Sequence, residues 1–306
     1  MRTALTALTT ELKRLKASGV RDVSISEESL AALRRAVTAQ KARAGKPATG
    51  EAVESKATME PAGSSSTPLR TAPVAKPAPA NLPPAPHVEL PPGDKPARWA
   101  VLRDLILNDA TCRAHVRPGK QVVFGVGNLD AKIMFVGEAP GAEEEVQGEP
   151  FVGPAGQLLT KMIGGMGLKR SDVYIGNIMN WRPEMPTPPG GTQYGNRPPT
   201  QEEMTYCLPY FKAQIEVVNP ELLVALGSTA AQGLLGFGTF KTLGEIRGRW
   251  HEFSGKPLMV TYHPSYILRN PTNRSKRLIW EDLLKVMERI ELPISEKQRG
   301  FFLDNK

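Results

Sequence analysis

The chain has 306 residues, and 39 Lys and Arg against 31 Asp and Glu leave a formal net charge of +8. No stretch reaches the roughly 18 uncharged apolar residues that span a bilayer, so we expect no membrane-embedded segment. Glu11, Lys13 and Arg14 interrupt the apolar core that a secretion signal would need, which favours a cytoplasmic location. Cys112 and Cys207 are too few for a disulfide scaffold. The positive charge fits a polyanionic partner such as nucleic acid.

Residues 1–40 predict two short helices that form a hairpin. Leucines recur at three- and four-residue spacing on both sides of a break at Gly19 and Val20, and Ser24 with Glu27 gives the signature of a helix start. Such an amphipathic hairpin either docks on the rest of the protein or binds a partner protein. The sequence leaves both alternatives open.

Residues 41–96 predict a disordered linker. This stretch holds 12 of the 28 prolines, together with many Ala, Ser, Lys and Glu residues and almost no aromatic residue. It cannot bury enough apolar surface to offset the entropy lost on ordering. We therefore expect a flexible, partly polyproline-like tether in front of a folded body.

The folded body is expected at residues 97–293, followed by a tail at residues 294–306. A helix with an apolar face starts near Trp99, and beyond it short apolar runs alternate with amphipathic segments. This alternation predicts an α/β fold, namely a three-layer α/β/α sandwich with a central, four-stranded, mostly parallel sheet. The predicted strands are residues 132–136, 173–177, 222–226 and 258–262, and the predicted helices are residues 154–166, 200–217, 228–236 and 275–290.

Polar residues that directly follow the strands are the expected functional residues, because ligands of parallel sheets bind at the carboxyl ends of the strands. An acidic, glycine-rich loop at residues 137–159 follows the first strand, and Asn177 ends the second. Residues 263–269, His-Pro-Ser-Tyr-Ile-Leu-Arg, follow the fourth strand. These three segments should meet at one edge of the sheet.

The same segments, together with Asn-Arg-Pro-Pro at residues 196–199 and Tyr-Cys-Leu-Pro-Tyr at residues 206–210, carry a family resemblance. In this order the motifs resemble the uracil-DNA glycosylase superfamily, most closely family 4, the thermostable bacterial and archaeal type. The resemblance covers about residues 99–290. It implies a DNA repair enzyme that rotates uracil out of DNA and hydrolyses its N-glycosidic bond, leaving an abasic site.

The resemblance assigns three residues to the uracil pocket. The carboxamide of Asn177 offers one acceptor and one donor, which match N3–H and O4 of uracil. Phe151 would stack on the flipped base. His263 would donate a hydrogen bond to uracil O2 and stabilise the negative charge that develops on the leaving base.

Which carboxylate positions the attacking water is left open by the sequence. Family 1 enzymes carry an Asp two residues after the first Gly of the loop, whereas Ala139 stands here, as in family 4. Glu138 and Glu144 align with family positions, and Asn196 matches an Asn of the pocket. The loop before Asn196 is long, as in relatives that bond covalently to uracil through a His, but it contains no His. The expected catalytic residues are His263, Glu138, Glu144 and Asn196, and the expected uracil-binding residues are Asn177, Phe151, Glu138 and Ala139.

The resemblance also implies a [4Fe–4S] cluster on four cysteines. Only Cys207 clearly matches a ligand position, Trp181 replaces the third ligand, and Cys112 with His115 cannot supply a matching N-terminal pair. We therefore expect no cluster, no other cofactor and no metal, with the space filled by packing around Trp181. A residual metal site at the two cysteines stays open.

DNA contacts outside the pocket are expected from residues 265–269. Ser265 and Arg269 would contact backbone phosphates, and Ile267 or Leu268 would fill the gap left by the extruded base. The expected partner is uracil-containing DNA, bound by a monomer.

Two other functions are compatible with parts of the sequence. A catalytically silent uracil-DNA-binding or scaffold protein would keep the pocket without releasing the base. A nucleotide-binding enzyme is disfavoured, because the Gly-Val-Gly at residues 125–127 lacks the rest of a dinucleotide fingerprint and no phosphate-binding loop motif exists. No Lys stands in the pocket motifs, which predicts a monofunctional glycosylase without a lyase step.

Overall fold

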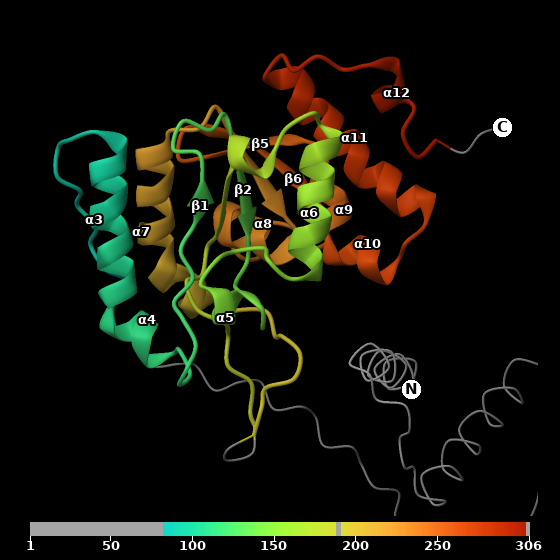
Figure 1. Ribbon diagram of the computed structural model, residues 1–306. Coiled ribbons are helices and arrows are strands. Elements are labelled where there is room, and N and C mark those ends of the chain that lie inside the picture. Colours follow the sequence, from blue (N-terminus) through green and yellow to red (C-terminus); the bar gives the residue numbers. More distant parts are fainter. Residues whose placement is uncertain (1–81, 188–190, 304–306) are drawn as a thin grey trace, which may run out of the picture. The chain divides into compact units, whose positions relative to one another are not determined.

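The fold is described by a computed structural model for residues 82–187 and 191–303 (Figure 1). The predicted hairpin at residues 1–40 and the first part of the predicted linker, residues 41–81, lie outside the described residues. Within the described ranges, no helix is long and apolar enough to cross a membrane.

A six-stranded sheet forms the centre of the body, in the order β1-β3-β2-β4-β6-β5. The four inner strands run parallel, and they agree with the four predicted strands to within a few residues. The two edge strands pair antiparallel and were not predicted, because β1 has two residues and β5 is polar in part and only half-buried. The strands are β1 (Val126–Gly127), β2 (Ile133–Gly137), β3 (Tyr174–Asn177), β4 (Leu222–Leu226), β5 (Trp250–Phe253) and β6 (Lys256–Thr261).

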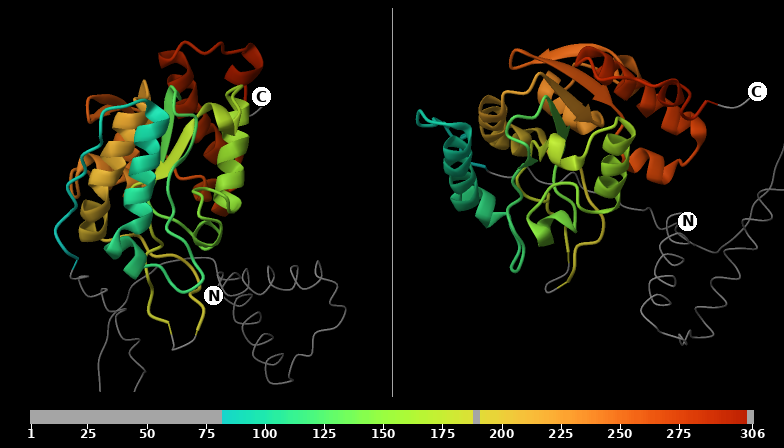
Figure 2. Two further views of the ribbon diagram at one scale, coloured as in Figure 1. Left: turned by 60° about the vertical axis from the view of Figure 1, so that its left-hand side comes forward. Right: turned by 45° about the horizontal axis from the view of Figure 1, so that its top comes forward.

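Helices cover both faces of this sheet. Every residue of β2, β3 and β4 is buried, which requires apolar cover on both sides. Met134 and Leu223 pack with α3, α4, α7 and α8 on one face, and Ile133 and Val224 pack with α6, α10 and α11 on the other. Figures 1 and 2 show the two helix layers with the sheet between them, so the three-layer sandwich is confirmed. The helices are α3 (Lys95–Asn108), α4 (Ala110–Ala114), α5 (Glu144–Gln147), α6 (Pro154–Gly165), α7 (Gln201–Val218), α8 (Ser228–Leu235), α9 (Leu243–Ile246), α10 (Ser265–Arg269), α11 (Asn273–Arg289) and α12 (Glu296–Arg299), with a 3-10 turn at Arg170–Asp172.

Local sequence signals set the ends of the long helices. Thr200 and Glu203 form a capping box at the start of α7, and Asn219 ends this helix in the left-handed conformation, with φ of 52°. The side chains of Asp94 and Thr272 cap the first turns of α3 and α11. Side-chain oxygens therefore replace the missing backbone partners at the starts of these three helices, whereas the end of α7 is set by the backbone conformation of Asn219.

The segment after α11, which we expected to be a tail, packs against the body in its described part. The indole Nε1 of Trp280 donates to the carbonyl oxygen of Gln298 at 2.6 Å, and Gln298 Nε2 donates to the carbonyl oxygen of Gly165 at 2.9 Å. The rings of Trp280 and Phe301 lie 5.2 Å apart. Residues 296–301 are thus fastened to α6 and α11.

The register of the inner strands places their carboxyl ends side by side. Gly137 of β2 pairs with Asn177 of β3, and Leu226 of β4 pairs with Thr261 of β6. The chain segments that leave β2, β4 and β6, together with Asn177 itself, therefore lie along one edge of the sheet. This is the edge at which parallel sheets bind their ligands.

Candidate active site

A small pocket of about 90 Å³ lies at the carboxyl edge of the inner strands. All seven residues predicted to be catalytic or uracil-binding line it, although they come from five separate segments of the chain. The structure therefore brings the predicted site together in one place. The lining residues are Glu138, Ala139, Gly141, Glu144, Phe151, Ala155, Asn177, Asn196 and His263.

Phe151 is held in the pocket wall by its backbone and by two glycines. Its φ of 55° lies in the left-handed region, which is unusual for a residue other than Gly. A Cβ on Gly137 would lie 2.6 Å from the Phe151 ring, and a Cβ on Gly156 would lie 1.8 Å from its carbonyl oxygen. The ring is 6% exposed, with its centre 5.6 Å from that of the His263 ring. The two glycines thus make room for an aromatic ring at a fixed place.

Asn177 ends β3 with an unsatisfied acceptor. The residue is 6% exposed, and its Oδ1 is buried without a hydrogen-bond partner among the described residues. A Cβ on Gly137 of the neighbouring strand would lie 2.2 Å from this oxygen, so only Gly fits beside it. An unpaired buried carbonyl costs about 1–3 kcal/mol. A ligand that donates a hydrogen bond to Oδ1 would remove this cost.

His263 is neutral, with its proton on Nε2. The backbone N–H of Ser265 points at His263 Nδ1 at 3.2 Å, and because a backbone N–H can only donate, Nδ1 carries no proton. The Ser265 hydroxyl also lies 2.8 Å from Nδ1, and its oxygen accepts from Arg269 at 3.1 Å. Burial, together with the positive charge of Arg269, lowers the pKa of His263 to about 4. The N–H available to the pocket is therefore that of a neutral imidazole.

The two predicted carboxylates have different surroundings. Glu144 accepts backbone N–H groups from Gly141, Val152 and Gly153 at 3.0–3.1 Å, so it ties together the two ends of the acidic loop. Glu138 accepts no backbone N–H group from the described residues. Burial raises the pKa of Glu138, against the opposing effects of a hydrogen bond from the Thr229 hydroxyl and the charge of nearby Arg269. Of the two, Glu138 is the one whose oxygens are not occupied by the loop backbone.

Asn196 is oriented by a buried arginine that sequence reasoning did not single out. Arg182 Nε donates to Asn196 Oδ1 at 2.8 Å, which leaves the amide N–H groups of Asn196 on the other side. The same guanidinium donates to Glu145 at 2.8 Å and to the carbonyl oxygen of Gly195 at 2.7 Å. Arg182 is 5% exposed. The sequence signal for this role was an arginine in the Trp-Arg-Pro motif of a chain that also carries the acidic run Glu143–Glu145.

The predicted DNA-contacting residues occupy α10, directly after His263. Ser265 is hydrogen-bonded to the imidazole, Arg269 donates to the Ser265 hydroxyl, and Arg269 is exposed. Ile267 is 7% exposed and belongs to the core under this face, whereas Leu268 is 49% exposed. Of the two apolar residues, only Leu268 has an exposed side chain.

The residues at the expected cluster position do not fit a four-thiolate cluster. Cys112 and Cys207 are fully buried, and a hydrogen bond to Cys207, together with burial, raises the pKa of the Cys112 thiol. Trp181 is fully buried, with its ring stacked on His115 at 4.9 Å. His115 Nδ1 is already bonded to the carbonyl oxygen of Thr111. In the described part of the chain, no group of three or more His, Cys, Asp or Glu residues could hold a metal ion.

Comparisons with known proteins give the same family as the motifs. A family model described as the uracil DNA glycosylase superfamily matches residues 124–284. The Type-4 uracil-DNA glycosylase of Thermotoga maritima is 40% identical to this chain over 186 residues, which are 60% of this chain and 91% of that protein. The Type-4 enzyme of Archaeoglobus fulgidus is 40% identical over 177 residues, with 56% and 83% covered. A Type-5 uracil-DNA glycosylase of Pyrobaculum aerophilum is 30% identical over 178 residues, with 53% and 72% covered.

The family resemblance expected from the motifs is thereby confirmed. The model match covers more than half of the chain, and the pocket that holds the predicted residues is built from segments inside the matched range. On these grounds the chain belongs to the uracil DNA glycosylase superfamily.

Proposed function

We propose that this protein is a monofunctional uracil-DNA glycosylase. It hydrolyses the bond between uracil and deoxyribose in DNA and leaves an abasic site. The observation that carries this proposal is a single pocket in which an unpaired amide acceptor, Asn177, and a neutral imidazole donor, His263, stand beside the ring of Phe151. The Type-4 and Type-5 relatives named above, which carry this activity in their names, support it.

Base recognition follows from the hydrogen-bonding pattern of the Asn177 amide. Its unpaired Oδ1 accepts N3–H of uracil and its Nδ2 donates to O4, a pattern that cytosine reverses. The flipped base stacks on Phe151, a contact that contributes about 1–3 kcal/mol. Uracil is therefore selected after it has left the duplex, as in other enzymes that act on a single base.

Bond cleavage uses His263 and one carboxylate. The C1′–N1 bond breaks with its electron pair moving to uracil, and Nε2–H of His263 donates to O2, where negative charge develops. One such preorganised donor lowers the activation free energy by about 2.7–4 kcal/mol. Water attacks C1′ and gives its proton to Glu138, whose pKa is raised by burial toward the range useful for a general base.

The other pocket residues position this machinery. Glu144 holds the acidic loop through three backbone bonds, and Asn196, oriented by Arg182, presents its amide N–H groups to the same pocket. No lysine is among the residues that line the pocket, so a Schiff base with the sugar is not expected.

We also infer that the enzyme works without an iron–sulfur cluster. The supporting observations are the free, fully buried thiols of Cys112 and Cys207 and the indole of Trp181 stacked on His115. DNA contact is assigned to Arg269 and, in the gap left by the base, to Leu268. We propose further that the enzyme acts on DNA as a monomer in the cytoplasm.

The test is release of uracil from a labelled oligonucleotide that contains one uracil, followed by alkaline cleavage of the abasic site. The native protein should convert the substrate, whereas His263→Ala and Asn177→Ala should each lower single-turnover cleavage by about 100-fold or more. Tyr194→Ala, an exposed residue of the long loop, is the matched control and should change the rate by less than about twofold. Binding of the oligonucleotide without release of base would instead identify a silent uracil-DNA-binding protein.

A further inference from the structure

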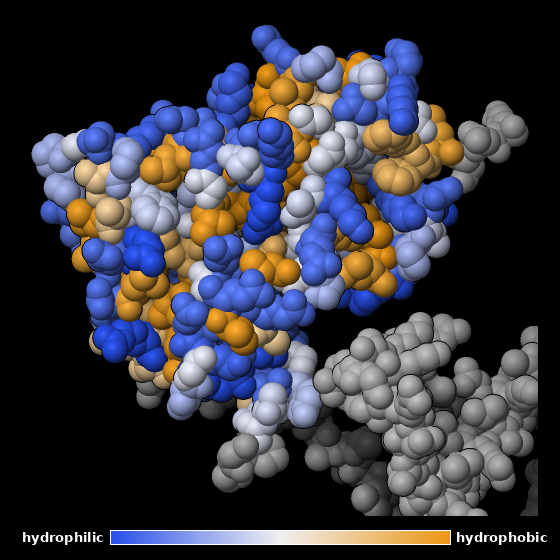
Figure 3. All heavy atoms as spheres, in the orientation of Figure 1, coloured by the Kyte–Doolittle hydropathy of each residue, from blue (hydrophilic) through white to orange (hydrophobic). Residues whose placement is uncertain are grey.

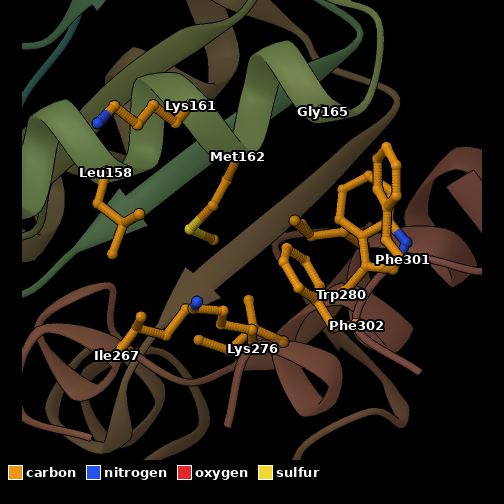
Figure 4. A pocket seen from close by; sticks show the side chains of 11 residues that line it. Leu158, Lys161, Met162, Gly165, Ile267, Lys276, Trp280, Phe301 and Phe302 are labelled. Carbon is orange, nitrogen blue, oxygen red and sulfur yellow. The ribbon is translucent and has the colours of Figure 1, made fainter. Parts of the chain in front are cut away.

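A second, larger pocket lies on the face covered by α6, α10 and α11, away from the active site. Its volume is about 300 Å³, and its lining is almost entirely apolar. Leu158 and Met162 of α6 point toward Ile267 of α10, and Trp280 with Phe302 closes one end (Figure 4). It shares no residue with the active-site pocket. The volume is at the lower limit of cavities that bind ligands in proteins.

Two lysines stand at this groove, one from each helix wall. Lys161 lies on α6 and Lys276 on α11, and no acidic residue is among the residues that line the groove. Neither lysine forms an ion pair with any residue of the described ranges, and Lys276 Nζ lies 5.8 Å from the centre of the Phe302 ring. Figure 3 shows hydrophobic surface on this side of α6, bordered by hydrophilic side chains. The groove thus combines an apolar interior with a positive rim.

This combination selects among possible occupants. A nucleic-acid base carries polar edges that an apolar cavity would leave unpaired, at a cost of about 1–3 kcal/mol for each group. A fatty acid has one anionic head, which could pair with only one of the two lysines, because these lie on opposite walls of the groove. A peptide with a bulky apolar side chain between acidic residues matches both the cavity and the two lysines.

We propose that this groove is a docking site for an acidic segment of a partner protein. One or two bulky apolar side chains of the segment fill the cavity between α6 and α11, and flanking carboxylates pair with Lys161 and Lys276. Because Ile267 of α10 forms part of the wall, the partner is held next to the helix that follows His263. The active-site pocket stays open, so DNA and partner can be bound together.

The test uses the full chain and the fluorescein-labelled peptide Asp-Glu-Asp-Phe-Leu-Asp-Glu, with binding followed by fluorescence anisotropy at physiological salt. We expect saturable binding to the native protein. The double variant Lys161→Glu, Lys276→Glu should weaken binding by at least about tenfold, and so should replacement of Phe-Leu in the peptide by Ser-Ser. Phe302→Ser, which changes a 39% exposed wall residue, should weaken it about threefold or more.

The matched control is Lys241→Glu, an exposed lysine next to Phe240, which belongs to the core of the opposite face. This variant should change the affinity by less than about twofold. Unfolding curves of all variants should superimpose, since none of the changed side chains is buried. A DNA duplex without uracil, or sodium dodecanoate, each in tenfold molar excess over the peptide, should not displace the peptide. Displacement by the duplex or by dodecanoate would overturn the proposal, as would no binding or equal binding to all variants.

Discussion

At the scale of single residues, the state of His263 is set by Ser265 and Arg269 of the following helix, α10. The backbone N–H of Ser265 fixes the tautomer, and burial with the charge of Arg269 keeps the ring unprotonated. The ring can then donate from Nε2 at neutral pH, where a free histidine would be partly charged. The chemistry therefore depends on a short hydrogen-bonded turn and not on the imidazole alone.

This arrangement makes stability depend on pH in a defined direction. The folded pKa of His263, about 4, lies below the unfolded value near 6.5, so the unfolded state binds a proton first as the pH falls. The free energy of unfolding should therefore drop between pH 6.5 and about 4, by on the order of 3 kcal/mol from this group. Denaturant unfolding of His263→Gln should show a flatter profile over this range. Identical profiles for native protein and variant would contradict the assignment.

A second prediction at this scale concerns Arg182 as a positioning residue for Asn196. Arg182→Lys keeps a charge near Glu145 but loses the fork that also holds Asn196 and Gly195. We expect kcat to fall by about tenfold or more, with KM changed by less than about threefold.

Arg117→Lys is the matched control for this variant, because Arg117 pairs with the same Glu145 oxygen but does not touch Asn196. It should leave kcat within about twofold of the native value. Equal losses of kcat in the two variants would show that Arg182 acts only through the ion pair.

At the scale of elements, strands that consist of apolar runs can be predicted from the sequence. Strands that exist only because they pair with a neighbouring strand cannot. The inner strands are continuous apolar stretches and were found, whereas β1 and β5 exist through pairing with β3 and β6 and carry no such run. The site residues follow strand ends and could be located. The roles of Arg182 and Glu144 depend on which loop lies opposite them, which no local pattern shows.

The packing around Trp181 leads to a prediction for the metal. The buried free thiols of Cys112 on α4 and Cys207 on α7, with the stacked rings of Trp181 and His115, fill the expected cluster position, so the purified protein should be colourless and free of iron. An absorption band near 400 nm would refute this. Trp181→Ala should lower the free energy of unfolding by about 3–5 kcal/mol, because the indole is fully buried. Tyr194→Ala, 85% exposed, should change it by less than about 0.5 kcal/mol.

At the scale of the whole molecule, catalysis should belong to the C-terminal part of the chain. Residues Ala72–Lys306 form one compact unit, and the family match lies inside it. A protein that begins at residue 72 should keep single-turnover uracil release within about twofold of the full chain. A protein that begins at residue 95 also loses Leu82, Val88 and Leu90, which pack on the core, and should unfold at lower denaturant concentration. Loss of turnover in the protein that begins at residue 72 would show that residues 1–71 are needed for catalysis.

The exposed guanidinium of Arg269 links events outside the pocket to those inside it. Its charge lowers the pKa of both His263 and Glu138, and it is also the side chain that we propose contacts a DNA phosphate. A bound strand that neutralises this charge would make the imidazole and the carboxylate more basic in the same step. The pKa values of both groups would then rise only when a DNA strand is bound. A free nucleoside has no phosphate and would leave both pKa values unchanged.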